Sequence, residues 1–357
     1  MSTQKSRGAG RARLKGTPRS QQRRATIKDV AEACGVAVST VSNALTGRRY
    51  VVEETRQQIL RTAERVGYRA SPMARGLRLQ RVWTIGFLVG DISNPYFPEM
   101  VRGAESILSA QHYNLTLCDT DYRLEKQEAY LQMLRDRRLD GLIVASQAEM
   151  VQGLADLVET GSPLVFINQQ YAGVETDYVG VDNWKGVDEA CKHLWSLGHR
   201  RIAFVRGRDG STAAHDRLEC FTRSIVSLSG EFDDSYVMPG DYSYESGVFS
   251  AKRLLSRKHR PTAIVAANDL SALGAMAAAE SLGLRIPTDI SIVGIDDIFV
   301  SAMSRISLTS VHQPKWELGA AAARMLLERI AEGRKERKEV VLESRLVKRA
   351  SSGPAPL

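Results

Sequence analysis

The sequence predicts an α/β protein with a small three-helix unit near its N-terminal end, followed by two doubly wound lobes. Three observations carry this prediction. Short amphipathic helical patterns fill residues 26–67, short apolar runs alternate with helical stretches from Trp83 onward, and 357 residues suffice for two or three domains. The 43% hydrophobic and 25% charged residues are ordinary values for a globular chain.

The first 25 residues form a basic arm. They hold eight of the 49 lysines and arginines and no acidic residue, so this arm accounts for the whole net charge of +8. Residues 26–80 add an excess of four positive charges, which leaves residues 81–357 with a net charge of −4. A basic end on a slightly acidic body is expected of a protein that binds phosphates at one end. We expect the arm to be disordered and to bind DNA non-specifically.

Residues 26–45 contain two short helical patterns joined by a tight turn. Thr26 and Asp29 have the spacing of a capping box, which marks a helix start. Gly35 permits a left-handed turn, and apolar residues at helical spacing resume at Val38. This pattern predicts a helix-turn-helix, although an ordinary helical hairpin remains an alternative. The residues between the apolar positions, which would face the major groove of DNA, are Ser39, Thr40, Ser42 and Asn43.

A third helix and a possible hinge segment follow. Residues 52–55 open a helical pattern that Gly67 closes. The stretch that begins at Pro72 can form only about one helical turn, which is marginal in water. Exposed Met73 and Leu77 beside arginines would suit insertion into a DNA minor groove, and a plain flexible linker is the alternative.

The rest of the chain predicts parallel strands covered by helices on both faces. The strands are continuous apolar runs rich in β-branched residues, and helical stretches such as 99–111 and 126–137 lie between them. Two such sets predict two lobes. The runs are 85–89, 115–118, 141–145, 164–167 and 178–181 in the first set and 202–205, 263–267, 290–293 and 308–311 in the second.

Polar residues follow many of these runs. Ligands of open α/β sheets bind beyond the carboxyl ends of the strands, and each buried OH or NH of a ligand needs a partner. Such residues facing one another would suit a polyhydroxylated or heteroaromatic ligand. Helix capping is the better interpretation for Asp91 or Asn268 alone. The residues are Asp91, Asn94, Asn168, Arg206, Arg208, Arg217, Asn268, Asp269, Asp296 and Asp297.

Other function classes lack support in the sequence. No apolar run is long enough to span a membrane, and the basic arm has no signal-peptide segment, so we expect a cytoplasmic, nucleoid-associated protein. The four cysteines form no C-x-x-C pair, so we expect reduced thiols, no metal and no cofactor. The phosphate-binding loops and the nucleophile elbow are missing, and the six histidines lack matched partners, so we expect no enzyme.

Eight segments in order resemble the LacI/GalR family of bacterial transcription regulators. They are ATIKDVAEACGVAVSTVSNAL, EETRQQIL, GYRASPMARGL, IGFLVGDISNPYF, HRRIAFV, HRPTAIVAANDLSALG, VGIDD and SVHQP. The resemblance covers about residues 25–349, and ATIKDVA, HRPTA and HQPK are most similar to the purine repressor branch. It implies a transcriptional repressor that binds palindromic double-stranded operator DNA as a homodimer, without membrane attachment. A small effector would bind between two lobes of periplasmic-binding-protein type.

The resemblance also implies a domain map. The chain would cross between the lobes near Val181, Gln313 and Arg337, and no segment remains for a tetramerisation coil. The map is a basic disordered arm at 1–25, a headpiece at 26–70, a hinge helix and linker at 71–81, lobe 1 at about 82–181 and 314–336, lobe 2 at about 182–312 and 337–349, and a disordered tail at 350–357.

The site residues follow from the same resemblance. Leu77 would be the wedge of the hinge helix, with Ala74 and Arg75 as its groove-facing neighbours. The expected DNA contacts are Thr26, Lys28, Val38, Ser39, Thr40, Ser42, Asn43, Arg49, Tyr50, Met73, Ala74, Arg75 and Leu77. The expected effector contacts are Asp91, Phe97, Ser211, Arg217, Tyr242, Asn268, Asp269 and Asp296.

Three departures from the family pattern are informative. Ala37 replaces the usual serine cap of the recognition helix, so a stabilising cap and a phosphate contact are absent. Asn43 replaces a common arginine, which predicts a preference for adenine over guanine at that operator position. Ser211 replaces an arginine of purine repressors, so Arg217 facing Asp91 and Asp296 favours a sugar or sugar acid over a purine.

A periplasmic solute receptor is the main rival, since it shares the two-lobed architecture. The attached headpiece and the missing signal peptide favour the regulator.

Overall fold

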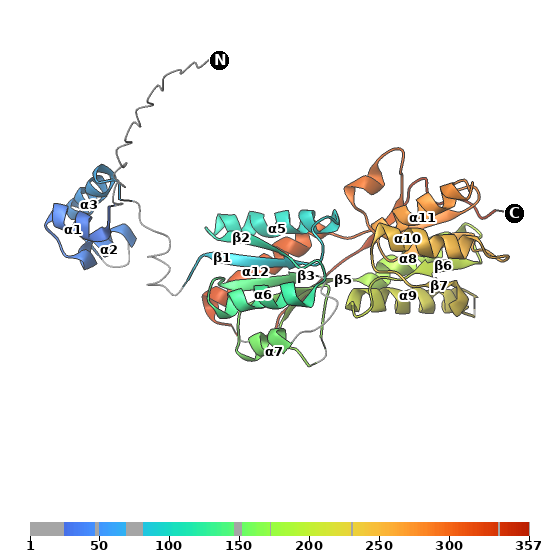
Figure 1. Ribbon diagram of the computed structural model, residues 1–357, viewed down its shortest axis with the longest axis horizontal. Coiled ribbons are helices and arrows are strands. Elements are labelled where there is room, and N and C mark those ends of the chain that lie inside the picture. Colours follow the sequence, from blue (N-terminus) through green and yellow to red (C-terminus); the bar gives the residue numbers. More distant parts are fainter. Residues whose placement is uncertain are drawn as a thin grey trace, which may run out of the picture. The chain divides into compact units, whose positions relative to one another are not determined.

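The computed structural model comprises two compact units, Met1–Leu79 and Gln80–Leu357, which are described separately (Figure 1). The structure describes residues 25–46, 50–68, 81–145, 152–171, 173–229, 231–334 and 336–356. The predicted hinge helix at 71–81 and the basic arm at 1–25 therefore lie outside the described residues, apart from the last residue of each.

Among its described residues, the first unit has three helices around a small apolar core. They are α1 (Ile27–Cys34), α2 (Val38–Thr46) and α3 (Glu53–Arg65). The predicted capping box is present at α1, because Thr26 N donates to Asp29 Oδ2 at 2.6 Å and Thr26 Oγ1 accepts from Asp29 N. Gly35 ends α1 with a left-handed φ of 63°. The core consists of Val30, Ala31, Val41, Ala44, Ile59 and Ala63.

The second unit contains two six-stranded sheets, one in each lobe (Figure 1). All neighbours in the lobe 1 sheet are parallel, as predicted, and in lobe 2 only β12 runs antiparallel. The order in lobe 1 is β11 (Glu339–Leu342), β5 (Asp177–Val181), β4 (Leu164–Ile167), β3 (Gly141–Ala145), β1 (Thr84–Val89), β2 (Asn114–Asp119). The order in lobe 2 is β12 (Arg345–Val347), β10 (Thr309–His312), β9 (Ser291–Asp296), β8 (Ala263–Ala266), β6 (Ile202–Val205), β7 (Val237–Met238).

Helices cover both faces of each sheet. In lobe 1, α5 (Tyr96–Ala110) and α12 (Lys315–Glu332) cover one face, while α6 (Leu124–Arg135) and α7 (Gln152–Glu159) cover the other. In lobe 2, α10 (Tyr244–Leu255) and α11 (Asp269–Ser281) lie opposite α8 (Asn183–Ser196) and α9 (Thr212–Ser229). Two 3-10 helices, η1 (Asp234–Tyr236) and η2 (Phe299–Ala302), complete lobe 2. Within the described ranges, every helix is too short or too polar to cross a lipid bilayer.

The third connection between the lobes differs from the prediction. The chain passes from β5 to α8 near Val181 and from β10 to α12 near Gln313, but the last passage lies between Leu342 and Arg345. The assignment of 337–349 to lobe 2 is wrong for its first part, because β11 pairs with β5 in lobe 1, and it holds for β12, which pairs with β10 in lobe 2. This strand lies at a sheet edge with Val340 and Val341 exposed, so it lacks the buried apolar run by which the other strands were recognised.

The prediction of a disordered tail at 350–357 is also wrong for the part that the structure describes. Ser351 is buried, and its hydroxyl donates to Ile292 O at 2.6 Å and accepts from Thr309 N at 2.8 Å. The buried His199 ring reaches Gly353 O at 3.0 Å. The small polar residues of the tail do not form an apolar pattern from which an ordered segment could be predicted. They are nevertheless held on lobe 2, because they form hydrogen bonds with its backbone N–H and C=O groups.

Candidate functional site

The predicted DNA-reading residues of the headpiece that the structure describes lie at the start of α1, along α2 and just after α2. Lys28, Val38, Ser39 and Tyr50 are exposed, and Thr26, Thr40 and Asn43 are partly buried. Ser42 is 7% exposed, so its expected orientation toward DNA is wrong. Its position beside Leu45 lies on the margin of the apolar stripe, where its small side chain packs within the headpiece. Arg49, Met73, Ala74, Arg75 and Leu77 lie outside the described residues.

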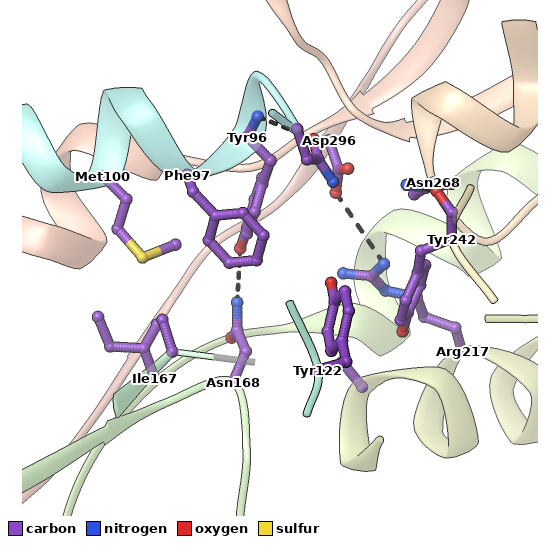
Figure 2. Close-up of a pocket in the computed structure, with 13 residues that line it drawn as sticks. Tyr96, Phe97, Met100, Tyr122, Ile167, Asn168, Arg217, Tyr242, Asn268 and Asp296 are labelled. Carbon is purple, nitrogen blue, oxygen red and sulfur yellow. Dashed lines mark hydrogen bonds and ion pairs between the residues drawn. The ribbon is translucent and has the colours of Figure 1, made fainter. Parts of the chain in front are cut away.

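A cavity lies between the carboxyl ends of the strands of the two lobes (Figure 2). Both lobes contribute to its wall, which mixes aromatic faces with amides, one guanidinium and one carboxyl group. The lining residues are Asn94, Tyr96, Phe97, Met100, Tyr122, Ala145, Ile167 and Asn168 from lobe 1 and Ala213, Arg217, Tyr242, Asn268 and Asp296 from lobe 2.

Two tyrosines occupy equivalent positions in the two lobes. Tyr122 follows β2 with a φ of 52°, and Tyr242 follows β7 with a φ of 73°. Bulky side chains rarely adopt such a left-handed backbone, and the surrounding structure must stabilise it. The glycine after the first strand of each lobe makes room for the ring, since a Cβ on Gly90 would lie 2.2 Å from Tyr122 and one on Gly207 would lie 2.3 Å from Tyr242. Each lobe thereby directs one tyrosine into the cavity.

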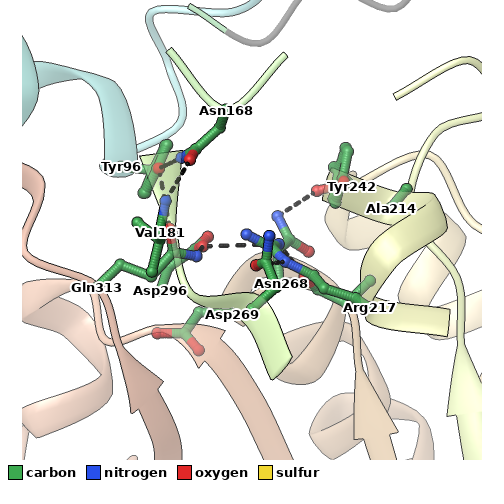
Figure 3. Close-up of polar contacts among 12 residues, drawn as sticks. Tyr96, Asn168, Val181, Ala214, Arg217, Tyr242, Asn268, Asp269, Asp296 and Gln313 are labelled. Carbon is green, nitrogen blue, oxygen red and sulfur yellow. Dashed lines mark hydrogen bonds and ion pairs between the residues drawn. The ribbon is translucent and has the colours of Figure 1, made fainter. Parts of the chain in front are cut away.

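A chain of hydrogen bonds runs from lobe 1 to lobe 2 along the cavity wall (Figure 3). Asn168 Nδ2 donates to Tyr96 Oη at 2.7 Å, and Tyr96 Oη donates to Gln313 Oε1 at 3.1 Å. Gln313 Nε2 then donates to Asp296 Oδ1 at 2.9 Å. Burial raises the pKa of Tyr96, so its hydroxyl keeps the proton that it donates.

Arg217 and Asp296 supply a guanidinium and a carboxyl group to the cavity wall. Arg217 Nη1 lies 4.0 Å from Asp296 Oδ1, and each side chain is 5% exposed. Arg217 is held in place by Nη1 donating to Ala267 O at 2.6 Å and Nε donating to Asn183 Oδ1 at 2.9 Å. Burial raises the pKa of Asp296, although Arg217 opposes that shift. The pair offers a ligand both a donor and an ionisable acceptor.

The structure brings five of the eight expected effector residues to the cavity wall, namely Phe97, Arg217, Tyr242, Asn268 and Asp296. Ser211 lies behind Tyr242, since its Oγ is 3.2 Å from Tyr242 Oη. Asp91 and Asp269 are not lining residues. Asp91 Oδ1 accepts from Ser93 N in a local turn.

Asp269 has a structural role instead of the expected ligand contact. Its carboxylate accepts from Ile298 N at 2.9 Å, Ser301 Oγ at 2.6 Å and Ser310 Oγ at 2.6 Å. These bonds tie α11 to the ends of β9 and β10 within lobe 2. The residue follows a strand, as expected of a site residue, but it points into the protein.

Sequence reasoning missed several lining residues, above all Tyr96 and Tyr122. Asn94 and Asn168 were noted as polar residues after strands and were not assigned to the effector. The dipeptide Asp-Tyr occurs at 121–122 and again at 241–242, after the second strand of each lobe. That internal repeat could have identified Tyr122 from Tyr242. The arrangement as a whole suits reversible binding of a small polar ligand.

Comparison with known proteins agrees with this architecture. Residues 26–71 match the family model described as bacterial regulatory proteins, lacI family, and residues 191–352 match a periplasmic binding protein-like domain. The HTH-type transcriptional repressor PurR of Serratia proteamaculans is 34% identical over 335 residues, 93% of this chain and 98% of the relative. PurR of Aliivibrio salmonicida is 35% identical over 92% of this chain and 98% of the relative.

Solved structures give the same result. The lac repressor dimer bound to operator and an anti-inducer has a TM-score of 0.80 at 25% identity and covers 93% of this chain and all of that one. A CelR–cellobiose complex has a TM-score of 0.71 at 30% identity, with 92% and 100% coverage. A ribose-bound regulator from Enterococcus faecium has a TM-score of 0.68 at 34% identity, with 76% and 99% coverage. The chain therefore belongs to the LacI family of bacterial transcription regulators.

Proposed function

We propose that this protein is a sequence-specific repressor whose affinity for palindromic operator DNA is controlled by a small effector bound between the lobes. The hydrogen-bonded chain from Asn168 through Tyr96 and Gln313 to Asp296 carries the proposal, because it joins both lobes along the wall of the cavity. An effector at this wall would change the relative stability of the open and closed lobes. The protein acts in the cytoplasm, on the nucleoid, as a homodimer and without catalysis.

The helix α2 would read the operator in the major groove. Val38 and Ser39 are exposed at its N-terminal end, and Asn43 lies about one turn further along. Two copies in a dimer would read two half-sites. Met73, Ala74, Arg75 and Leu77 of the hinge segment would enter the minor groove between the half-sites.

A sugar or sugar acid is the effector that the cavity favours. Asn94, Asn168 and Asn268 supply amide donors and acceptors, and Arg217 beside Asp296 suits adjacent hydroxyl groups. The cellobiose and ribose complexes of the structural neighbours agree with this class. Tyrosine and phenylalanine faces would pack against the apolar side of a sugar ring.

A purine corepressor is the second candidate. The curated relatives at 34–35% identity are PurR repressors, and Phe97 and Tyr242 both line the cavity. A planar base could stack on such rings. Ser211 behind Tyr242 supplies only a hydroxyl where purine repressors have an arginine, which is why we rank the sugar class first.

Three experiments test the proposal. Binding-site selection on random duplex DNA should recover a palindrome, and a thermal-shift screen of sugars, sugar acids and purines should identify one class that raises Tm. Leu77→Ala should weaken binding to the selected operator while leaving salt-dependent non-specific binding nearly intact. An equal loss of both kinds of binding would remove the wedge role of Leu77, and a selection without any consensus would refute the repressor.

A further inference from the structure

Arg208 is a half-buried guanidinium at the edge of the cavity that lacks an acidic partner. It belongs to the loop after β6 in lobe 2, and its Cζ lies 4.0 Å from the ring centroid of Tyr122 in lobe 1. Its Nε is buried without a hydrogen-bond partner among the described residues. The one hydrogen bond of its side chain that the structure gives is a long contact of 3.4 Å from Nη2 to the Asp241 backbone carbonyl.

Against the effect of burial, the charge of Arg208 helps to lower the pKa of Asp241, which is hydrogen-bonded to other groups. No carboxylate among the described residues lies within 4.0 Å of the Arg208 guanidinium. The Asp241 carboxylate accepts from Ser243 N at 2.9 Å and from Ser243 Oγ at 2.6 Å. Burying part of a guanidinium without an anion is unfavourable, so the site would be stabilised by an oxyanion.

The neighbouring Arg206, in the same loop, has the acidic partner that Arg208 lacks among the described residues. Its Nη2 donates to Asp209 Oδ1 at 2.7 Å in an exposed pair. Arg206 does not line the cavity and does not stack on an aromatic ring. The two arginines are separated only by Gly207, yet they differ in partner and in position.

Arg208 lies next to the cavity because it contacts Tyr122, a residue of the cavity wall. Tyr122 lines the cavity and also stacks with the guanidinium, so a ligand in contact with Tyr122 lies close to Arg208. A guanidinium binds carboxylate and phosphate oxygens through two parallel N–H donors. Since Arg208 and Tyr122 come from different lobes, an anion held here would also affect lobe closure.

We propose that Arg208 is an oxyanion subsite at the edge of the interlobe cavity and that the effector carries a carboxylate or a phosphate held there. This inference rests on the proposed effector-binding role of the cavity. It narrows the sugar class to sugar acids and sugar phosphates. Neutral sugars would lack the group that Arg208 requires.

The test measures Tm of the full chain in sodium chloride, acetate and phosphate at equal ionic strength, and then with D-glucose, D-glucuronate and D-glucose 6-phosphate. We expect an oxyanion at ten times its dissociation constant to raise Tm by about 3 °C in the wild type and in Arg206→Met. Arg208→Met should lose this rise. A preference for acetate and glucuronate would identify a carboxylate, and a preference for phosphate and glucose 6-phosphate would identify a phosphate.

Other outcomes overturn the subsite. An equal rise of Tm in the wild type, Arg206→Met and Arg208→Met would show that the anion binds elsewhere. No rise of Tm with any oxyanion in the wild type would show that Arg208 binds none. Arg208→Lys, which keeps the charge without the planar fork, should show a reduced rise and serves if Arg208→Met does not fold. If binding-site selection recovered no operator, the proposed repressor function would be refuted, but the Tm measurements would still test the oxyanion subsite.

Discussion

Gln169 of lobe 1 and Thr212 of lobe 2 join the two lobes beside the cavity. Thr212 N donates to Gln169 Oε1 at 3.0 Å, and Gln169 Nε2 donates to Gly210 O at 3.2 Å. The Thr212 hydroxyl donates to Gln170 O at 2.9 Å and accepts from Gln170 N at 3.1 Å. The loop after β4 is thus bonded to the start of α9, and these bonds exist only while the lobes are close together.

Thr212→Val should therefore favour opening of the lobes. The change removes two hydrogen bonds and keeps the β-branched shape, so closure should weaken by roughly tenfold. Small-angle X-ray scattering of the ligand-free protein should give a larger radius of gyration. Thr160→Val is the control, because Thr160 Oγ1 donates to Leu157 O within lobe 1. Identical scattering from both variants and the wild type would show that Thr212 does not hold the lobes together.

Asp177→Asn should destabilise lobe 1. The carboxylate is fully buried and bonds to Arg329 at 3.0 Å, to Arg334 at 2.6 Å and to Lys338 N at 2.8 Å. Burial alone would raise its pKa, but these hydrogen bonds outweigh burial, so the pKa lies below its usual value. Removing this charge leaves two arginines without their carboxylate, which should lower the free energy of unfolding by about 3 kcal/mol.

Urea unfolding monitored by circular dichroism measures that loss. Glu343→Gln is the control, since Glu343 pairs with Lys185 at 2.8 Å on the exposed surface, where ion pairs contribute little. A similar small effect of both substitutions would show that the Asp177 cluster does not stabilise lobe 1.

His199 should make the stability of lobe 2 depend on pH. Its ring lies 3.0 Å from Thr262 Oγ1 and 3.0 Å from Gly353 O. Burial lowers its pKa, partly opposed by the contact with the Gly353 carbonyl. The pKa of His199 in the folded protein lies below the unfolded value of about 6.5. The contribution of neutral His199 to the stability of lobe 2 is therefore fully present above pH 6.5 and is lost as the pH falls through the folded pKa.

His199→Gln, which keeps the polar contacts without the titration, should flatten the fall of Tm on the acidic side. Exposed His259→Gln should leave the pH profile unchanged. An acidic slope of Tm that is the same in all three proteins would show that His199 does not contribute to it.

The sequence predicted the strands that are buried in the middle of each sheet better than those at the edges. Parallel strands such as β3 and β8 are covered on both faces, so they read as uninterrupted apolar runs. The edge strands β7, β11 and β12 were missed. β7 has two residues, and β11 is mostly exposed, so neither leaves a periodic signal.

The cavity was predictable where a polar residue ends a strand and much less where a helix contributes. Asn268 follows β8 and Asp296 ends β9, and both line the cavity, whereas Asp269, next to Asn268, points away. Local sequence cannot distinguish these cases, because the direction of a side chain depends on long-range packing. From the sequence, Tyr96 on α5 could equally be a core aromatic, whereas in the structure it lines the cavity and bonds to Asn168 and Gln313.

Tyr96→Phe should weaken the connection between the lobes. The change leaves Asn168 Nδ2 and Gln313 Oε1 without the hydroxyl that they contact, in a buried site. Unsatisfied buried polar groups cost about 1–3 kcal/mol, so the free energy of unfolding should fall by about 2 kcal/mol. Tyr236→Phe is the matched control, since Tyr236 Oη donates to the carbonyl of exposed His259. Equal unfolding curves for the two variants would show that the Tyr96 hydroxyl adds nothing to the wall.

Asn43→Arg should change the base that the headpiece prefers at one operator position. Asn43 lies on α2 about one turn after exposed Ser39 and is itself partly exposed, so a longer side chain can reach past the helix surface. Asparagine pairs with N6 and N7 of adenine, whereas arginine pairs with O6 and N7 of guanine, and each such pair discriminates by about 1–3 kcal/mol. Binding-site selection should therefore move from adenine to guanine at a single symmetric position. Asn43→Gln should keep adenine, and recovery of the wild-type consensus with the arginine variant would show that this side chain does not read a base.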